Sequence, residues 1–154
     1  MANPVEQIRR ARESDCPAVV DLIADLRHKE QGLVVDRAPI LSTLSSALRE
    51  PACLVLVAEA EGVVVGFVVV HWVVFPMLAG TEAYVSDLIV AATRRGRGIG
   101  RSLVGAVEEE ARSRGCVRLM LNNRIAANSF QRGFYPKLGY RHREEFANFV
   151  KPLR

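Results

Sequence analysis

The sequence is poor in cysteine: its 154 residues contain only Cys16, Cys53 and Cys116. Their number is odd, they lie far apart, and none belongs to a CxxC pair. The pattern therefore lacks the ligand spacing of a zinc site and the dithiol of a redox motif. We predict free thiols, with Cys53 and Cys116 as buried strand residues, no bound metal, and a cytoplasmic location, where disulfides are rare.

The sequence also lacks a long uninterrupted apolar segment. No apolar run follows the basic residues near the N-terminus, so no signal peptide is predicted. The longest apolar stretch, from Val63 to Ala79, contains His71 and Pro76. It is shorter than the ~20 residues that a membrane-spanning helix needs. Its many valines favour a buried strand, and we predict no membrane partner.

Repeats, linkers and low-complexity segments are missing as well. The composition, with 49% hydrophobic and 25% charged residues, is that of an ordinary globular protein. A chain of this length is typical of one domain, so we predict a single domain over residues 1–154. Its formal charge of +4 indicates an anionic partner, and on charge alone this can be nucleic acid, a phosphate-bearing cofactor or a membrane surface.

The periodicity of the apolar residues predicts an alternation of strands and helices. A first strand closes at Ile8–Ala11, and a helix then begins with Ser14 as N-cap and ends at Gly32. The other predicted elements are a helix from Pro39 to Pro51, strands over 53–60, 63–75 and 81–92, a helix from Ile99 to Gly115, a strand over 116–123, a helix over 127–139 and a strand from Tyr140 onward. This order indicates an α/β (α+β) fold whose mixed, mostly antiparallel sheet is flanked by about four helices.

A glycine-rich turn with four arginines, Arg94 to Arg101, connects a predicted strand to a predicted helix. Glycines allow successive backbone N–H groups to face one concavity, and the helix N-terminus adds a positive dipole end, so such a turn binds phosphate. It is not a P-loop, because no Gly-Lys-Ser/Thr follows, and Gly96, Gly98 and Gly100 do not give GxGxxG. An RNA contact is the alternative, but no aromatic residue is interleaved with these arginines.

Two segments resemble the GNAT superfamily of N-acetyltransferases. Arg95–Gly100 matches its Q/R-x-x-G-x-G/A motif, and the preceding strand, Tyr84–Val90, is similar to the family's central strand. Farther along, the chain is similar to the family's N-x-x-A-x-x-F-Y-x-K-x-G-F helix through Asn128, Phe134, Tyr135, Lys137 and Gly139. Gln131 replaces the usual alanine, which bears on packing near the cofactor's pantetheine arm, and Tyr140 replaces phenylalanine.

The resemblance implies acetyl-CoA as acetyl donor and a primary amine as acceptor. It also implies that the central strand, the glycine turn and the second motif bind the cofactor. The residues concerned are Leu88, Ile89, Val90, Arg95, Gly96, Arg97, Gly98, Ile99, Gly100, Arg101, Ser102, Asn128 and Tyr135. In this family the cofactor's arm separates the central strand from the next one, and a freed backbone N–H can then polarise the thioester carbonyl.

Two side chains are candidates for the proton transfers. The Tyr135 hydroxyl can donate a proton to the leaving thiolate. Asp87 stands where the family often has an acidic residue, and it can accept a proton from the alkylammonium group through water, with Glu82 as the alternative. For both carboxylates a structural role on a sheet face stays open. His71 lies on an apolar strand and is interpreted as a core histidine.

The sequence therefore predicts an enzyme, an acetyl-CoA-dependent N-acetyltransferase in which the amine attacks directly within a ternary complex. The predicted acceptor is a small-molecule amine. A protein N-terminus or lysine is an alternative acceptor, and a non-catalytic CoA-binding sensor is an alternative function. Metal and nucleic acid are not expected as partners, and a homodimer is the oligomer that base rates favour.

Overall fold

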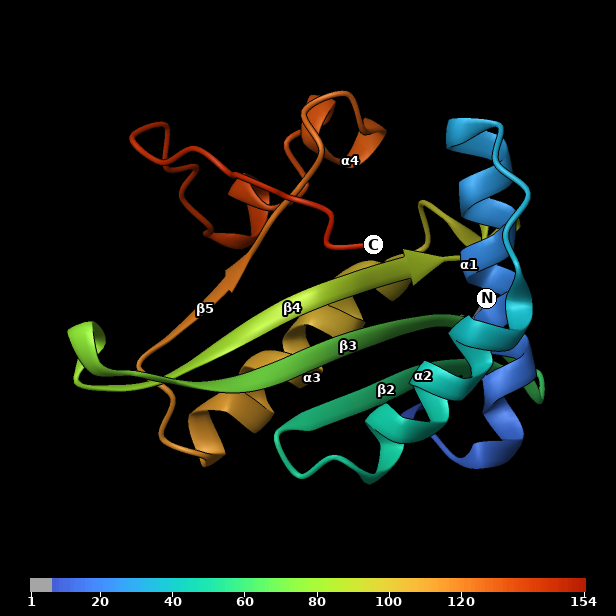
Figure 1. Cartoon of the computed structure of the whole chain (residues 1–154), viewed down its shortest axis with the longest axis horizontal. Coiled ribbons are helices and arrows are strands. Elements are labelled where there is room, and N and C mark those ends of the chain that lie inside the picture. The colour runs from blue at the N-terminus through green and yellow to red at the C-terminus, as the bar shows by residue number, and fades with distance from the viewer. Residues whose placement is uncertain (1–6) are drawn as a thin grey trace. The chain divides into compact units, whose positions relative to one another are not determined.

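A computed structural model describes residues 7–154, which divide into two compact units after Asn122. The first unit contains a five-stranded sheet in the order β1-β2-β3-β4-β5 (Figure 1). The second, Asn123–Arg154, consists of short helical turns and extended chain. Within residues 7–154 no helix has the length and apolar character needed to cross a bilayer.

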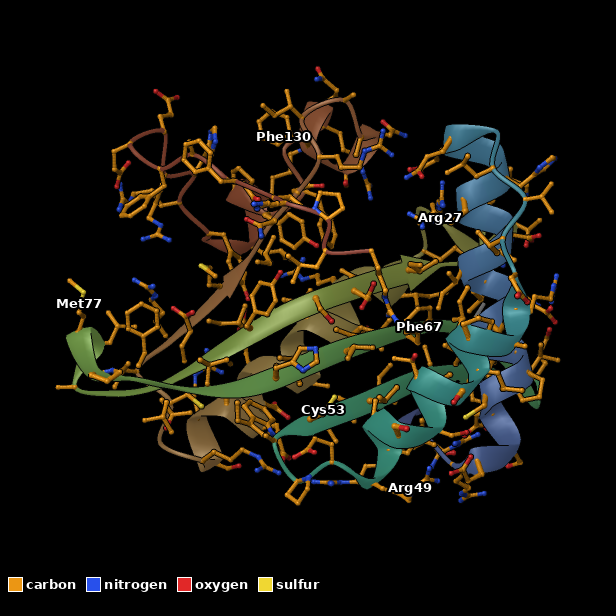
Figure 2. All side chains as sticks on the ribbon, in the orientation of Figure 1. Arg27, Arg49, Cys53, Phe67, Met77 and Phe130 are labelled. Carbon is orange, nitrogen blue, oxygen red and sulfur yellow. The ribbon has the colours of Figure 1, made fainter. Side chains whose placement is uncertain are left out.

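Four strands of the sheet are antiparallel neighbours: β1 (Gln7–Arg10), β2 (Cys53–Ala60), β3 (Val63–Phe75) and β4 (Gly80–Val90). The fifth strand, β5 (Arg118–Leu121), pairs with β4 in parallel. The apolar stretch that includes His71 thus forms β3 and the 3₁₀ turn η2 (Pro76–Leu78), at the tip of which Met77 is exposed (Figure 2). The predicted mixed, mostly antiparallel sheet is confirmed.

Helices cover both faces of this sheet. On one face lie α1 (Cys16–Gln31) and α2 (Arg37–Arg49), and on the other lies α3 (Ile99–Ser113), which runs behind the strands in Figure 1. Successive side chains of β3 alternate between the two cores because a strand repeats every two residues. Phe67, labelled in Figure 2, packs with α1 and α2. Its neighbour Val68 packs with Leu103 of α3.

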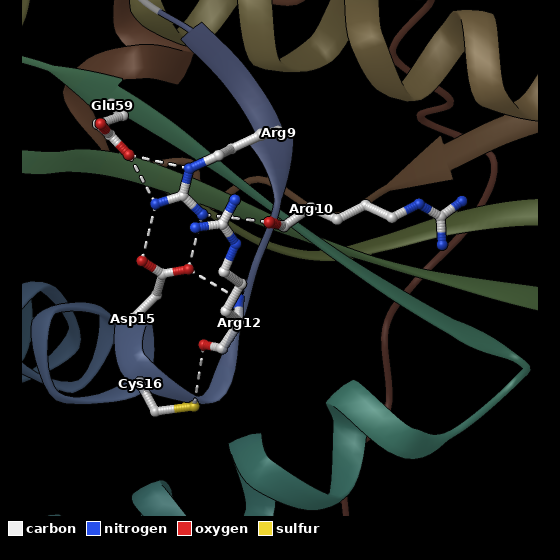
Figure 3. Close-up of polar contacts among 6 residues, drawn as sticks. All are labelled: Arg9, Arg10, Arg12, Asp15, Cys16 and Glu59. Atoms are coloured by element: carbon white, nitrogen blue, oxygen red, sulfur yellow. Dashed lines mark hydrogen bonds and ion pairs between the residues drawn. The ribbon is translucent and has the colours of Figure 1, made fainter. Parts of the chain in front are cut away.

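Helix α1 begins differently from the prediction. A 3₁₀ turn, η1 (Glu13–Asp15), precedes it, and Asp15 rather than Ser14 is the N-cap. The Asp15 carboxylate makes no capping bond to the helix, because it accepts hydrogen bonds from the guanidinium of Arg9 on β1 (Figure 3). Arg9 also donates to Glu59 of β2, so this network ties the first strand to its neighbour and to the first helix.

The second unit departs most from the predicted elements. The expected helix over 127–139 is reduced to α4 (Asn128–Gln131), because Gly133 adopts φ +64° and η4 (Pro136–Leu138) begins at a proline. The strand predicted from Tyr140 onward is wrong, since residues 140–154 contain no strand. Apolar residues in this segment do not alternate with a period of two, so no sheet face is defined.

Candidate active site

Strand β4 carries a bulge at Ser86. The pairing of β3 with β4 matches Val69 with Asp87 but Val70 with Val85, so Ser86 has no opposite residue. Such a bulge bends the strand and increases its twist. Strand β5 pairs with β4 only before the bulge, and the two strands diverge from that end in Figure 1. Within residues 7–122, β4 therefore has one open edge from the bulge to its end.

The residues after the bulge present their backbone groups alternately to β3 and to this open edge. The N–H of Ala91 donates to the carbonyl of Val65 on β3 at 2.9 Å. Antiparallel alternation therefore directs the backbone groups of Ile89 toward β3 and those of Leu88 and Val90 toward the open edge. Of the three strand residues predicted at the cofactor, Ile89 is engaged in the sheet through its backbone, and the other two face outward.

The glycine turn joins β4 to α3 and is exposed. Gly96 and Gly98 have φ of +77° and +88°, a left-handed conformation that favours glycine. Gly98 is also the N-cap of α3 and has no side chain to cap the helix. The first N–H groups of α3, from Ile99 onward, lack partners within the helix and point out of its N-terminus. An anion such as a diphosphate fits this set of donors.

Two arginines of the turn are engaged by neighbouring groups. Arg94 forms an ion pair with Glu61 of the β2–β3 turn at 2.8 Å. Arg95 donates from Nε to the carbonyl of Val90 at 3.1 Å. The latter bond confirms that this carbonyl faces the open edge of β4 rather than β3.

The remaining polar side chains near the turn differ in whether they are free to bind an anion. Arg97 and Arg101 have exposed side chains and can reach an anion at the turn. The hydroxyl of Ser102 donates instead to the carbonyl of Gly98 at 3.2 Å. Ser102, which was predicted to bind the cofactor, can donate to a phosphate only after it gives up this bond.

The candidate base Asp87 ends a chain of three side chains. The Ser86 hydroxyl donates to the Asp87 carboxylate at 2.8 Å and lies 2.9 Å from Nε2 of His71 on β3. Ser86 and Asp87 are exposed and His71 is half-buried, so the interpretation of His71 as a core histidine is wrong. Sequence reasoning missed the pair because the bulge that brings Ser86 to His71 has no local signal such as a glycine.

Glu82, the alternative base, is a structural residue. Its side chain is 3% exposed, and its carboxylate binds the guanidinium of Arg118 on β5. This ion pair joins β4 to β5 at the first residue pair of their short paired segment, which ends at Val85 and Leu121. The salt-bridged role that the sequence left open is the one the structure contains.

The second unit holds the predicted acid, Tyr135, directly before η4. Its ring packs edge-on against Phe134 and Tyr140, with centroids 4.9 and 5.7 Å away. Burial raises the pKa of Tyr135 to about 12, so its hydroxyl stays protonated at physiological pH. Asn128 is exposed at the start of α4.

The three cysteines are free thiols. Cys16 is buried, while Cys53 and Cys116 are half-buried, and burial raises the pKa of each thiol. Since the thiolate is the reactive form, none of them has the character of a nucleophile. Residues 7–154 contain no group of three or more His, Cys, Asp or Glu side chains that could hold a metal ion.

Comparison with known proteins shows that the chain is an acyltransferase. Residues 9–140 match the acetyltransferase (GNAT) family, and the chain belongs to this family, whose members use acetyl-CoA. The predicted family, fold class and N-acetyltransferase class are therefore confirmed.

Individual relatives agree with this assignment. The chain is 29% identical over 150 residues to the aminoalkylphosphonate N-acetyltransferase of Salmonella typhimurium. The aligned region covers 97% of this chain and 93% of that protein. It is 30% identical over 128 residues to the thialysine N-epsilon-acetyltransferase of Mus musculus, covering 75% of this chain and 72% of the other. A possible acetyltransferase from Clostridium difficile has the same fold, with a TM-score of 0.83 at 14% identity over 97% of this chain and 99% of that one.

Proposed function

We propose that this chain transfers the acetyl group of acetyl-CoA to the primary amine of a small molecule, by direct attack within a ternary complex. The observation that carries the proposal is the junction of β4 with the glycine turn. There the open strand edge after Ser86 continues into a turn whose N–H groups have no side-chain cap. An arm that contains amides and ends in a diphosphate needs both features in this order.

The proposed cofactor contacts follow from these donors and acceptors. The backbone groups of Leu88 and the N–H of Val90 bond the amides of the pantetheine arm, as an added strand would. The N–H groups of residues 96–101 hold the diphosphate, and Arg97 and Arg101 add charge. Arg95 has to share or release the Val90 carbonyl when the arm binds. When bound, acetyl-CoA supplies an activated thioester.

The proton transfers are assigned to two side chains. Tyr135 donates a proton to the departing thiolate, and its raised pKa keeps that proton in place until the sulfur carries charge. Asp87 receives the proton that the acceptor ammonium loses. Asn128 belongs to the cofactor-binding set through the second motif. No covalent enzyme intermediate is needed, because proximity of the bound amine and thioester supplies much of the acceleration.

A small-molecule acceptor is favoured by the relatives, since the proteins similar to this chain are named for an aminoalkylphosphonate and for thialysine. An aminoalkylphosphonate also carries negative charge, which suits a chain with a formal charge of +4. A protein N-terminus or lysine is the competing acceptor.

We also propose that both units form one N-acetyltransferase domain, because the family match over residues 9–140 runs across the boundary at Asn122. A cytoplasmic location is part of the proposal, and the three free cysteines support it, because disulfides are rare in that compartment. The homodimer stays a prediction.

One experiment separates the candidate functions. Acetyl-CoA is titrated while thermal stability is followed, and free thiol is then measured with 2-aminoethylphosphonate, thialysine, a polyamine and a lysine-containing peptide. A binder gains about 2.7 kcal/mol of stability at a hundredfold excess over Kd. No stabilisation by acetyl-CoA refutes both the enzyme and the sensor. Stabilisation without thiol release favours the sensor, and release with the peptide alone favours protein acetylation.

A further inference from the structure

The bulge of β4 creates the contact between Ser86 and Asp87. In a regular strand two successive side chains point to opposite faces of the sheet. The extra residue at Ser86 breaks this alternation, so that the Ser86 hydroxyl reaches the carboxylate of the next residue at 2.8 Å. The same hydroxyl meets Nε2 of His71 at 2.9 Å. The chain of three groups therefore lies where the open edge of β4 begins.

The directions of these hydrogen bonds fix where the imidazole carries its hydrogen. The Ser86 hydroxyl has a single hydrogen and donates it to Asp87. Its oxygen must then accept from His71, which places a hydrogen on Nε2. A neutral imidazole with Nε2–H has its basic lone pair on Nδ1.

We propose that His71 is the base that removes the proton from the acceptor amine, with Ser86 and Asp87 as positioning residues that hold its proton-accepting tautomer. The inference rests on the proposed function and makes His71, rather than a water held by Asp87, the group that accepts the proton. His71 is half-buried beside two exposed residues, so its ring is accessible from the sheet face.

The step balances in protons and electrons. Nδ1 of His71 takes one hydrogen of the ammonium, and the N–H bonding pair stays on nitrogen as the lone pair that attacks the thioester. The ring then carries a hydrogen on both nitrogens, and its Nε2–H stays donated to Ser86, whose hydroxyl stays donated to the Asp87 carboxylate. After the acetyl group has moved to the amine, Nδ1 releases the proton to water and the ring returns to its Nε2–H form.

Three ionisable side chains face His71 from the two neighbouring strands. Its cross-strand partners are Cys53 on β2 and Tyr84 on β4, whose ring centroid lies 6.2 Å away. Burial and Glu50 raise the pKa of the Cys53 thiol, which therefore carries no charge near neutral pH. Asp87 supplies the negative charge that is hydrogen-bonded to the ring through Ser86.

The test compares His71→Gln with His28→Gln, a matched change of an exposed histidine on α1. We measure the acetyl-CoA Kd and the pH dependence of kcat with 2-aminoethylphosphonate and thialysine. His71→Gln is expected to keep the Kd, to lower kcat by about 100-fold or more, and to lose the fall of kcat between pH 8 and pH 5 that a histidine base imposes. His28→Gln is expected to behave as wild type. An unchanged kcat profile in His71→Gln overturns the proposal.

Two further variants test the positioning role of Ser86 and Asp87. Asp87→Asn removes the carboxylate at the end of the chain, and Ser86→Ala removes its hydrogen-bonded link to the ring. Both are expected to lower kcat less than His71→Gln does and to keep the acid limb that His71 imposes. If Asp87→Asn abolishes this limb and His71→Gln leaves it, then Asp87 acts through water and His71 has no part in the chemistry.

A spectroscopic measurement decides the proposal even without turnover. If the wild-type enzyme releases no thiol with either amine, this result counts against the proposed function only. The ¹⁵N chemical shifts of His71 in the free protein report its tautomer independently of turnover. A hydrogen on Nε2 and none on Nδ1 is expected, with a mixture of tautomers in Ser86→Ala. A ring that carries its hydrogen on Nδ1 overturns the proposal.

Discussion

Arg9 and Asp15 form a two-pronged ion pair, with Nη1–Oδ2 and Nη2–Oδ1 distances of 2.8 and 2.9 Å (Figure 3). Asp15 is 7% exposed, and Arg9 also donates to Glu59. Replacement of Arg9 leaves both carboxylates without their donor. We therefore expect Arg9→Met to lower the free energy of unfolding by about 2–4 kcal/mol, measured by urea denaturation.

The adjacent arginine supplies the control. Arg10 pairs with Glu110 at 3.1 Å, but its side chain is 65% exposed, so solvent screens the pair. Arg10→Met should change the free energy of unfolding by less than about 0.5 kcal/mol. Equal losses in the two variants would show that the Arg9 network contributes no more than a surface pair.

The Arg9–Asp15 ion pair also makes the free energy of unfolding depend on pH in the acid range. The hydrogen bond from Arg9 lowers the pKa of Asp15 below its ordinary value. A carboxyl group whose pKa is lower in the folded state stabilises the fold above its unfolded pKa, and this contribution is lost as pH falls through the folded value. We expect the free energy of unfolding to decline below about pH 4 more steeply in wild type than in Asp15→Asn. Arg9→Met should show the shallow decline as well, and a steep decline in both variants would exclude Asp15 as its source.

Gly66 is fixed by close approach of the β4 backbone. A Cβ at this position would stand 3.0 Å from the carbonyl oxygen of Ile89 and 3.4 Å from side chains of α3. Gly66→Ala is therefore expected to lower the free energy of unfolding by about 1–3 kcal/mol. Gly105→Ala on α3 is the control, since nothing lies within 4 Å of its added Cβ, and helix propensity predicts no loss or a small gain. The prediction is wrong if calorimetry finds the two variants alike.

Several features of the fold were predictable because they depend on residues that are neighbours in the sequence. The runs of valine predict β3. Glu61-Gly62 is a turn signal in the sequence, and both residues adopt positive φ in the hairpin turn. A glycine inside a strand indicates a bulge or a close backbone approach, and both occur at Gly66, where the register of β2 against β3 shifts beside it. The glycine turn before α3 was predictable for the same reason, because its backbone conformation depends on residue type.

The features that the sequence did not reveal depend on contacts between residues that lie far apart along the chain. The Asp15 carboxylate makes no capping hydrogen bond to α1, because it is bound by Arg9 of strand β1. Ser86 becomes a bulge residue through the register of β4 against both neighbours, and no residue type nearby announces it. His71 therefore had no visible partner in the sequence, although its partner lies just across the β3–β4 hairpin.

The phosphate assignment of the turn is tested by Gly98→Val. At φ +88° a valine is strained, and its side chain would occupy the space from which a diphosphate approaches the N–H groups of α3. Acetyl-CoA should lose its stabilising effect in a thermal shift measurement. Gly115→Val, with φ +70° at the other end of α3, carries similar strain and should bind acetyl-CoA normally. Equal affinity of the two variants for acetyl-CoA would refute the assignment.

The acid is tested by Tyr135→Phe, which removes the hydroxyl and keeps the ring that packs on Phe134 and Tyr140. Turnover should fall by about 100-fold with the acetyl-CoA Kd unchanged, because general acid catalysis contributes on this scale. Tyr140→Phe introduces the residue usual in the family and should keep wild-type turnover. An acid acts only in its protonated form, and burial raises the pKa of Tyr135 to about 12, so kcat in the wild type should show no decline from this group up to pH 10. A decline of kcat as pH rises through neutrality, removed by Tyr135→Phe, would contradict this prediction, because the Tyr135 hydroxyl would then lose its proton far below pH 12.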